Sequence, residues 1–136
     1  MCWKWFEKNK DLASLPLRIV LAAVFIVHGH AKLFGGLEGT ASFFSSIGLP
    51  LAGILAFIVA VGEFFGGIAL LIGFLTRYFA TFLSIVTIFA ILLVHLSGGY
   101  ELALLALGGS ISLIFLGAGR LSIDEKCTNW CKKKKK

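Results

Sequence analysis

The stretch that decides the fold is residues 60–74, AVGEFFGGIALLIGF, in which a single carboxylate, Glu63, lies inside an apolar run. A charged side chain at bilayer depth costs at least ~2.5–3.5 kcal/mol on insertion scales. Only a compensating contact inside the fold, or a selected function, offsets such a cost. Glu63 therefore indicates either a buried partner or a functional site.

The composition places this stretch in a membrane protein. Of the 136 residues, 58% are hydrophobic and 15% are charged, and the mean hydropathy is +0.93. A soluble domain would lack the polar surface needed to cover so large an apolar core. The net charge of +6 is concentrated at the two ends beside apolar segments. This distribution favours contact with an anionic membrane face, and nucleic acid is not expected as a partner.

Four apolar segments are each near the ~20 residues that a bilayer core requires, and inside lipid each must be helical. The sequence therefore predicts an all-α, integral membrane four-helix bundle, with spans at residues 16–34, 51–74, 78–96 and 101–116. Between the first two spans, Phe43, Phe44 and Ile47 group on one side of a helix too short to cross the membrane. A short interfacial or re-entrant helix is expected there, around residues 41–47.

The basic residues predict the orientation. They lie in the N-terminal segment, in the turn between spans two and three, and in the C-terminal segment: Lys4, Lys8, Lys10, Arg18, Arg77, Arg120, Lys126 and Lys132 to Lys136. Excess Lys and Arg mark the cytoplasmic side. We therefore expect a multi-pass cell-membrane protein with both termini in the cytoplasm. Residues 1–15 form a cytoplasmic segment, residues 16–120 the four-span domain, and residues 121–136 a lysine-rich tail on anionic lipid.

Glu63 is the acidic residue predicted nearest to the middle of the membrane, and its partner is expected on the first span. His28 and Lys32 are four residues apart and share a helix face, whereas His30 points elsewhere. Lys32 is favoured over His28, because its flexible stem reaches towards the midplane. The pair has two open interpretations: a structural tie between helices, or a site that handles protons or hydrogen-bonds a bound cofactor.

Other polar residues have weaker signals. Arg18, Arg77 and Arg120 lie at the cytoplasmic ends of spans, where they either extend to lipid headgroups or serve a structural role. His95, at the outer end of the third span, joins His28 as a candidate site residue. Two histidines on different helices are a haem-ligand pattern, but nothing in the spacing makes them face one another, so haem is not expected.

The cysteines give no metal motif. Cys127 and Cys131 are separated by three residues, and Cys2 lies at the other end of the chain. Neither a CxxC redox pair nor a four-ligand zinc pattern is present, so no metal site is predicted. Inert or palmitoylated thiols are the simpler interpretation.

The glycines near Glu63 predict its packing. Gly62 and Gly66 form a small-xxx-small pair, which lets another helix approach closely. We expect both, with the neighbouring Gly67, to lie against another helix, so that the face of Glu63 points into the bundle.

Taken in order, four segments resemble the DoxX family of small four-helix membrane proteins. They are LRIVLAAVFIVHGHAKLFGG, SSIGLP, VGEFFGGIALLIGFLTRY and GAGRLSID, and they extend from Leu17 to Asp124. The most specific part is the Glu-x-x-Gly-Gly run that ends in Gly-x-x-Thr-Arg. The resemblance implies quinone-dependent redox chemistry, as a quinol oxidase or thiosulfate:quinone oxidoreductase subunit, or membership of a membrane oxidoreductase complex in thiol and oxidative stress.

The leading hypothesis is therefore an integral membrane subunit of a quinone-linked oxidoreductase complex that binds quinone or lipid among its four helices. Membrane lipids and other membrane subunits are the expected partners. The candidate proton or quinone site comprises Glu63, Lys32, His28 and His95. Two alternatives stay open: a non-catalytic assembly or accessory protein that stabilises a larger complex, and a small proton-linked transporter.

Overall fold

A computed structural model describes residues 3–95 and 99–133, apart from the side chains of residues 6, 94, 95, 129 and 131–133. Across these residues the secondary structure is helical, without a strand. Four long helices form the body of the protein: α2 (Ser14–Phe34), α4 (Ala52–Ile72), α5 (Thr76–Ala90) and α6 (Tyr100–Leu116). The predicted all-α fold is confirmed.

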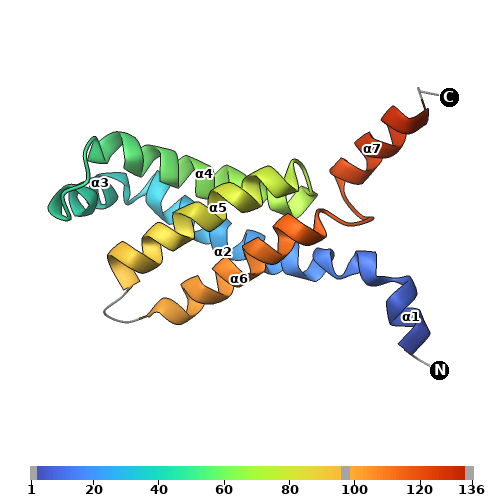
Figure 1. Cartoon of the computed structure of the whole chain (residues 1–136). Helices are drawn as coiled ribbons and strands as arrows, with labels where there is room; N and C mark the ends of the chain where they lie inside the picture. The colour runs from blue at the N-terminus through green and yellow to red at the C-terminus, as the bar shows by residue number, and fades with distance from the viewer. Residues whose placement is uncertain (1–2, 96–98, 134–136) are drawn as a thin grey trace.

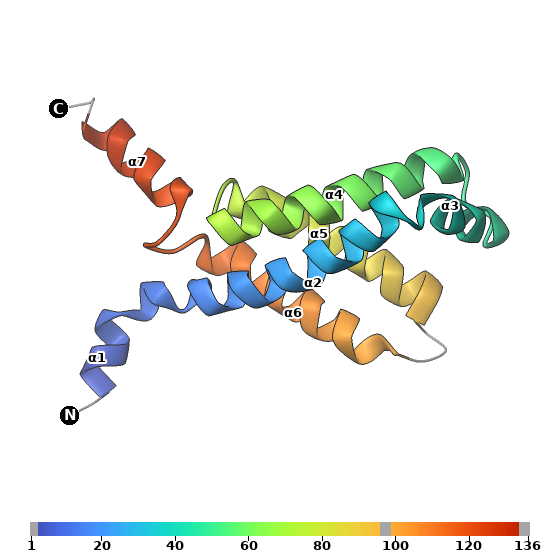
Figure 2. The ribbon, with the colours of Figure 1, turned by 180° about the vertical axis from the view of Figure 1, so that it is seen from behind.

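The four long helices form a closed ring. Helix α4 packs against α2 and α5, and α6 completes the ring by packing against α5 and α2. Successive helices run in alternating directions, and both chain ends lie at the same end of the bundle (Figures 1 and 2). We call this the terminal end, and the opposite end, which carries α3, the distal end.

The helix lengths agree with the predicted spans. Among the described residues, three segments are long and apolar enough to cross a membrane by length and composition: Lys10–Phe34, Ala52–Ile72 and Thr76–Leu93. Helix α6 is apolar and has 17 residues, so the predicted fourth span is again the shortest. Helix α5 continues into the π-helix η2 (Ile91–His95), and Leu96, the predicted end of the third span, lies outside the described residues.

The predicted short helix between the first two spans is present as α3 (Leu37–Ser46), which starts four residues before the expected residue 41. It packs against α4 at the distal end (Figure 1). In its first turn Thr40 Oγ1 donates a hydrogen bond to the Gly36 carbonyl, at 2.8 Å. This local bond stabilises the start of α3, whereas the packing against α4 holds the helix on the bundle.

Two terminal helices were not predicted: α1 (Trp3–Lys8), which is followed by the 3-10 turn η1 (Lys10–Leu12), and α7 (Ile123–Lys133). Helix α7 begins with a side-chain cap, since the Glu125 N–H donates to Ser122 Oγ at 3.2 Å. Asp124 and Glu125 also place negative charge in the first turn, where the helix dipole favours it. The segment expected as a solvated tail therefore starts as a helix.

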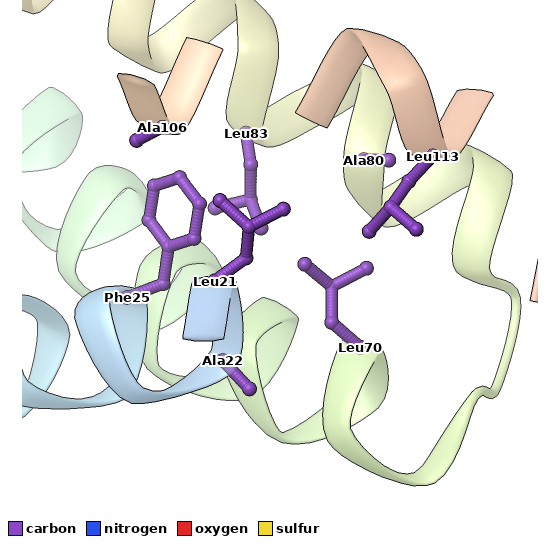
Figure 3. Close-up of a cluster of buried hydrophobic side chains, with 8 residues drawn as sticks. All are labelled: Leu21, Ala22, Phe25, Leu70, Ala80, Leu83, Ala106 and Leu113. Carbon is purple, nitrogen blue, oxygen red and sulfur yellow. The ribbon is translucent and has the colours of Figure 1, made fainter. Parts of the chain in front are cut away.

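The apolar core lies where the four long helices meet (Figure 3). Its buried side chains come from every one of them: Leu21, Ala22, Phe25, Leu70, Ala80, Leu83, Ala106 and Leu113. Along α2, the core residues Leu21 to Phe25 lie between Arg18 on one side and His28 and Lys32 on the other. The core therefore separates two polar clusters, one towards each end of the bundle.

Glycines set the spacing between α2 and α4. A Cβ atom added to Gly29 would meet the backbone nitrogen of Phe64 and come within 2.7 Å of its Cα. A Cβ on Gly67 would lie 2.9 Å from the backbone nitrogen of Ile26. Only residues without a side chain permit this approach, so the two helices are in backbone contact beside Glu63.

The predicted contacts of Gly62, Gly66 and Gly67 with another helix are confirmed, but they involve two partners. Gly67 faces α2, as described above. Gly62 lies against the ring of Phe82, and Gly66 lies against Phe79 and Leu83, all on α5. Gly62 and Gly66 therefore make room for side chains of α5, whereas the close backbone approach of α2 occurs on the neighbouring face of α4, at Gly67.

Candidate functional site

The Glu63 carboxylate is bound by Lys32, as expected from the sequence. Lys32 Nζ lies 2.6 Å from each of the two carboxylate oxygens. The Glu63 side chain is 7% exposed and the Lys32 side chain 28% exposed. The cation therefore reaches from a half-buried position to an acid that is enclosed by the bundle.

The close approach of α2 and α4 explains this geometry. Gly29 places the α2 backbone directly against Glu63 and Phe64. Lys32 follows Gly29 by about one helical turn, so its stem must fold back along α2 to reach the carboxylate. A buried ion pair barely offsets the loss of hydration of its two charges. Its presence in the bundle is therefore not explained by stability alone.

A cavity of about 120 Å³ lies beside the pair, between α2, α4, α5 and α6. Four polar side chains line it: His28, Lys32, Glu63 and Thr87. The remaining lining residues are apolar: Val24, Phe25, Ala90, Gly99, Leu102, Ala103 and Ala106. An apolar cavity with a few convergent polar groups is typical of a small-molecule site.

His28 adds a proton acceptor to this cavity. Its Nδ1 lies 2.8 Å from the Val24 carbonyl oxygen. Because a carbonyl oxygen only accepts, Nδ1 carries the hydrogen, and in the neutral ring Nε2 is the basic nitrogen. His30 takes no part: its ring contacts Phe34, with ring centroids 4.8 Å apart, and lies near Phe64. The two histidines therefore point in different directions, as predicted.

Thr87 is a lining residue that the sequence analysis missed. It is buried, and its Oγ1 donates to the Leu83 carbonyl at 2.7 Å, which leaves the oxygen lone pairs as acceptors. The available signal was helical spacing, since Thr87 follows the small buried residues Ala80 and Ser84 on one face of α5. His95, the fourth predicted site residue, is the last residue of η2, and its side chain lies outside the described residues.

The second polar cluster surrounds Arg18 at the terminal end. The Arg18 side chain is 1% exposed and donates four hydrogen bonds, all to backbone carbonyl oxygens. The acceptors are the carbonyls of Leu70, Leu71, Ala118 and Leu121, at 2.7 to 2.9 Å. Two lie at the end of α4, where unpaired carbonyls and the negative end of the dipole favour a cation. Of the two interpretations left open for Arg18, headgroup contact or a structural role, the structure therefore supports the structural one.

Asp124 completes this cluster. Its two carboxylate oxygens accept hydrogen bonds from the N–H groups of Leu75 and Thr76, at 2.7 and 2.9 Å. Its own N–H donates to the Gly73 carbonyl at 2.9 Å. Asp124 thus caps α5 from a distant part of the chain, and it holds the turn in which Leu75 has the positive φ of 46°. These contacts extend past residue 120, the predicted end of the spanning domain.

Arg77 and Arg120 differ from Arg18, since both are exposed. They line a larger cavity at the terminal end, of about 780 Å³. Within the described chain, no group of three or more His, Cys, Asp or Glu residues is placed to hold a metal ion. Cys127 is an exposed free thiol, while Cys2 and the Cys131 side chain lie outside the described residues.

Comparisons with known proteins agree with this architecture. A family model described as DoxX matches residues 13–96. The protein named "Putative oxidoreductase CatD" of Bacillus subtilis (strain 168) is 36% identical over 122 residues, covering 87% of this chain and 89% of the relative. "Inner membrane protein YqjF" of Escherichia coli (strain K12) is 33% identical over 125 residues, covering 87% of this chain and 94% of the relative. No solved structure gives a significant match.

Proposed function

The chain belongs to the DoxX family of membrane proteins, and from this premise we propose that it is an integral membrane subunit of a quinone-linked oxidoreductase complex. Its site is the cavity beside Glu63 and Lys32. The observation that carries the proposal is a buried ion pair that borders an apolar cavity together with His28 and Thr87. The oxidoreductase name of the Bacillus subtilis relative supports the same class of chemistry.

The arrangement suits a quinone headgroup for two reasons. The apolar walls from α5 and α6 accept a ring, and the Lys32 ammonium is a donor for a ring carbonyl oxygen. Reduction of a quinone couples electron uptake to proton uptake, and the electrons come from a redox partner in the complex. The chain itself supplies the proton route: Glu63 and Lys32 hold a proton between them, and His28 Nε2 exchanges one with the exterior.

Glu63→Gln tests the proton role, because it keeps the shape and hydrogen-bonding capacity of the side chain but removes the titrating group. A positioned proton-transfer group contributes about 10²–10⁴-fold to a rate, so quinone-linked electron transfer is expected to fall by at least about 100-fold. The measurement is turnover of a short-chain quinone by membranes that contain the complex. Glu38→Gln, an exposed acid on α3, is the matched control.

Two further results separate the alternatives. If the Glu63→Gln protein accumulates normally and its turnover is unchanged, the ion pair between Glu63 and Lys32 has a structural role only. Purification from native membranes then distinguishes the remaining hypotheses by what copurifies. Bound quinone supports the proposal, whereas a stoichiometric membrane protein without quinone supports an assembly role. If neither quinone nor a partner protein copurifies, the result would favour a small proton-linked transporter.

We also propose that the terminal end faces the cytoplasm, so that residues 1–15 and 121–136 flank the four-span domain on that side. The shared location of both termini and the exposed Arg77 and Arg120 support this orientation. Cys127 is exposed and provides a native probe. An impermeant thiol reagent added to intact cells is expected to label Ser45→Cys on α3 and to leave the native thiols unlabelled. Labelling of Cys127 in sealed cells would show that the terminal end faces the outside, which contradicts the proposed orientation.

A further inference from the structure

The cavity at the terminal end has a built polar lining that the proposed redox site does not use. It lies among η1, the start of α5, the end of α6 and the start of α7, and its volume of about 780 Å³ is within the range of ligand-binding pockets. Three cationic side chains line it, Lys10, Arg77 and Arg120, together with the carboxylates of Asp11, Asp124 and Glu125. Groups of both signs therefore converge on one space.

The cationic side of the cavity is available to a ligand. Arg77 and Arg120 are exposed, and within the described residues neither guanidinium group has a hydrogen bond or an ion pair. The Arg77 guanidinium lies close to the end of α6, since a Cβ on Gly117 would be 3.4 Å from its Nε. Arginine matches a phosphate group well, because its planar donors form charge-assisted hydrogen bonds to two oxygens at once.

A buried, unpartnered hydroxyl points to the same conclusion. Thr76 is 0% exposed, lines this cavity, and its Oγ1 has no hydrogen-bond partner among the described residues. Buried polar atoms are nearly always paired, so an unpaired one indicates a missing partner. The backbone N–H groups of α5 are not that site, because Asp124 already accepts from Leu75 and Thr76.

The carboxylates define the second half of the ligand. The Asp124 carboxylate is committed to capping α5, since both of its oxygens accept from backbone N–H groups. Asp11 is exposed on η1 and remains available to a cation. A ligand that carries only a phosphate would place a second negative charge near the Asp11 carboxylate. A ligand with both a phosphate and an ammonium group would pair with the arginines and with Asp11.

The apolar rim indicates that the ligand is a lipid. Tyr78 and Phe115 are 76% and 79% exposed and border the same cavity. Tyr78 lies near the start of α5 and Phe115 near the end of α6, at the terminal end of the bundle. Aromatic side chains at the ends of spanning helices are typical of the membrane interface, where lipid headgroups lie. We propose that this cavity binds a zwitterionic phospholipid of the phosphatidylethanolamine class, with the phosphate on Arg77 and Arg120 and the ammonium on Asp11. The site is independent of the proposed redox role.

Native mass spectrometry of the purified full-length chain in detergent tests the proposal. Phosphatidylethanolamine, phosphatidylglycerol and phosphatidylcholine with the same acyl chains are offered in turn. Phosphatidylethanolamine is expected to be retained best, because phosphatidylglycerol lacks the cation and the choline group has no N–H to donate. Equal retention of phosphatidylglycerol would overturn the zwitterionic assignment. Displacement of the lipid by an equimolar amount of free phosphoethanolamine would overturn the lipid assignment.

Matched variants locate the binding site. The double variant Arg77→Gln/Arg120→Gln is expected to lower phosphatidylethanolamine affinity by about tenfold or more, since charge-assisted hydrogen bonds are lost. Lys126→Gln, an exposed cation on α7 outside the cavity, is expected to change it little. Asp11→Asn should reduce the preference over phosphatidylglycerol, and Glu7→Gln on α1 should leave it intact. An equal loss of phosphatidylethanolamine affinity in Lys126→Gln would overturn the proposed site. If a variant does not fold, the lipid preference of the wild-type protein still tests the proposal.

Discussion

Arg18 and Glu63 are both buried, charged side chains of spanning helices, and their surroundings differ in one decisive respect. Arg18 directs its donors to four backbone carbonyl oxygens that stay in place as long as the helices do. Glu63 has one cationic partner, on the flexible and half-buried side chain of Lys32, and a cavity beside it. The Arg18 charge is held by four backbone acceptors, whereas the Glu63 charge is held by one part-exposed side chain and borders a cavity.

This difference is the one expected between a structural charge and the functional charge that we propose for Glu63. The Arg18 hydrogen bonds join α2 to the end of α4 and to the segment after α6, so they fix the terminal end of the bundle. No proton or ligand exchange is possible without breaking that end. The Glu63 pair joins only α2 and α4, which glycine contacts already hold together. The fold therefore does not depend on this pair alone, in agreement with the ligand-binding role that we propose for it.

The largest expected effect is that of Arg18→Met. It leaves four buried carbonyl groups with fewer partners, and removing one side of such a buried charged contact costs about 3–5 kcal/mol. The variant should melt at a much lower temperature in detergent, or fail to accumulate in membranes. Lys126→Met, at an exposed position outside both sites, is the control and should change the melting temperature little. A stable Arg18→Met protein would show that the Arg18 hydrogen bonds are not needed to hold the terminal end together.

Gly29→Ala is expected to have an intermediate effect. The added Cβ would meet the backbone of Phe64 and push α2 away from α4, at a cost of about 1–3 kcal/mol for overpacking. Separation of the helices should also weaken quinone-linked turnover by displacing Lys32 from Glu63. Gly108→Ala on α6 is the matched control, because its Cβ meets nothing within 4 Å. Equal melting temperatures for the two variants would contradict the backbone contact.

The smallest expected effect is the coupling between Lys32 and Glu63. Lys32→Met leaves the carboxylate buried without its cation, so adding Glu63→Gln should restore part of the lost stability. The double-mutant cycle is expected to give a coupling of about 1–2 kcal/mol, within the range for residues in direct contact. Thermal unfolding of the four proteins in detergent measures it. A coupling near zero would mean that the two groups do not interact in the folded protein.

The sequence predicted the architecture well, and part of the site. Apolar length gave four spans, and reach along a helix gave Lys32 as the partner of Glu63. Helix α7 was missed although its signal is local: Ser122 and Glu125 form the Ser-x-x-Glu pattern of a helix start. Thr87 likewise lies at a helical spacing from Ala80 and Ser84 that indicates a buried face.

The role of Arg18 illustrates what the sequence did not decide. By itself the sequence determined the class of the protein, because each span must bury its backbone polar groups in a helix and each apolar run must lie in lipid or in the core. The acceptors of Arg18 are backbone carbonyls, and these belong to every residue alike, so no side-chain pattern identifies them. They are 52 to 103 residues away in the chain. Only the packing of the four helices surrounded Arg18 with backbone acceptors and left a cavity beside Glu63.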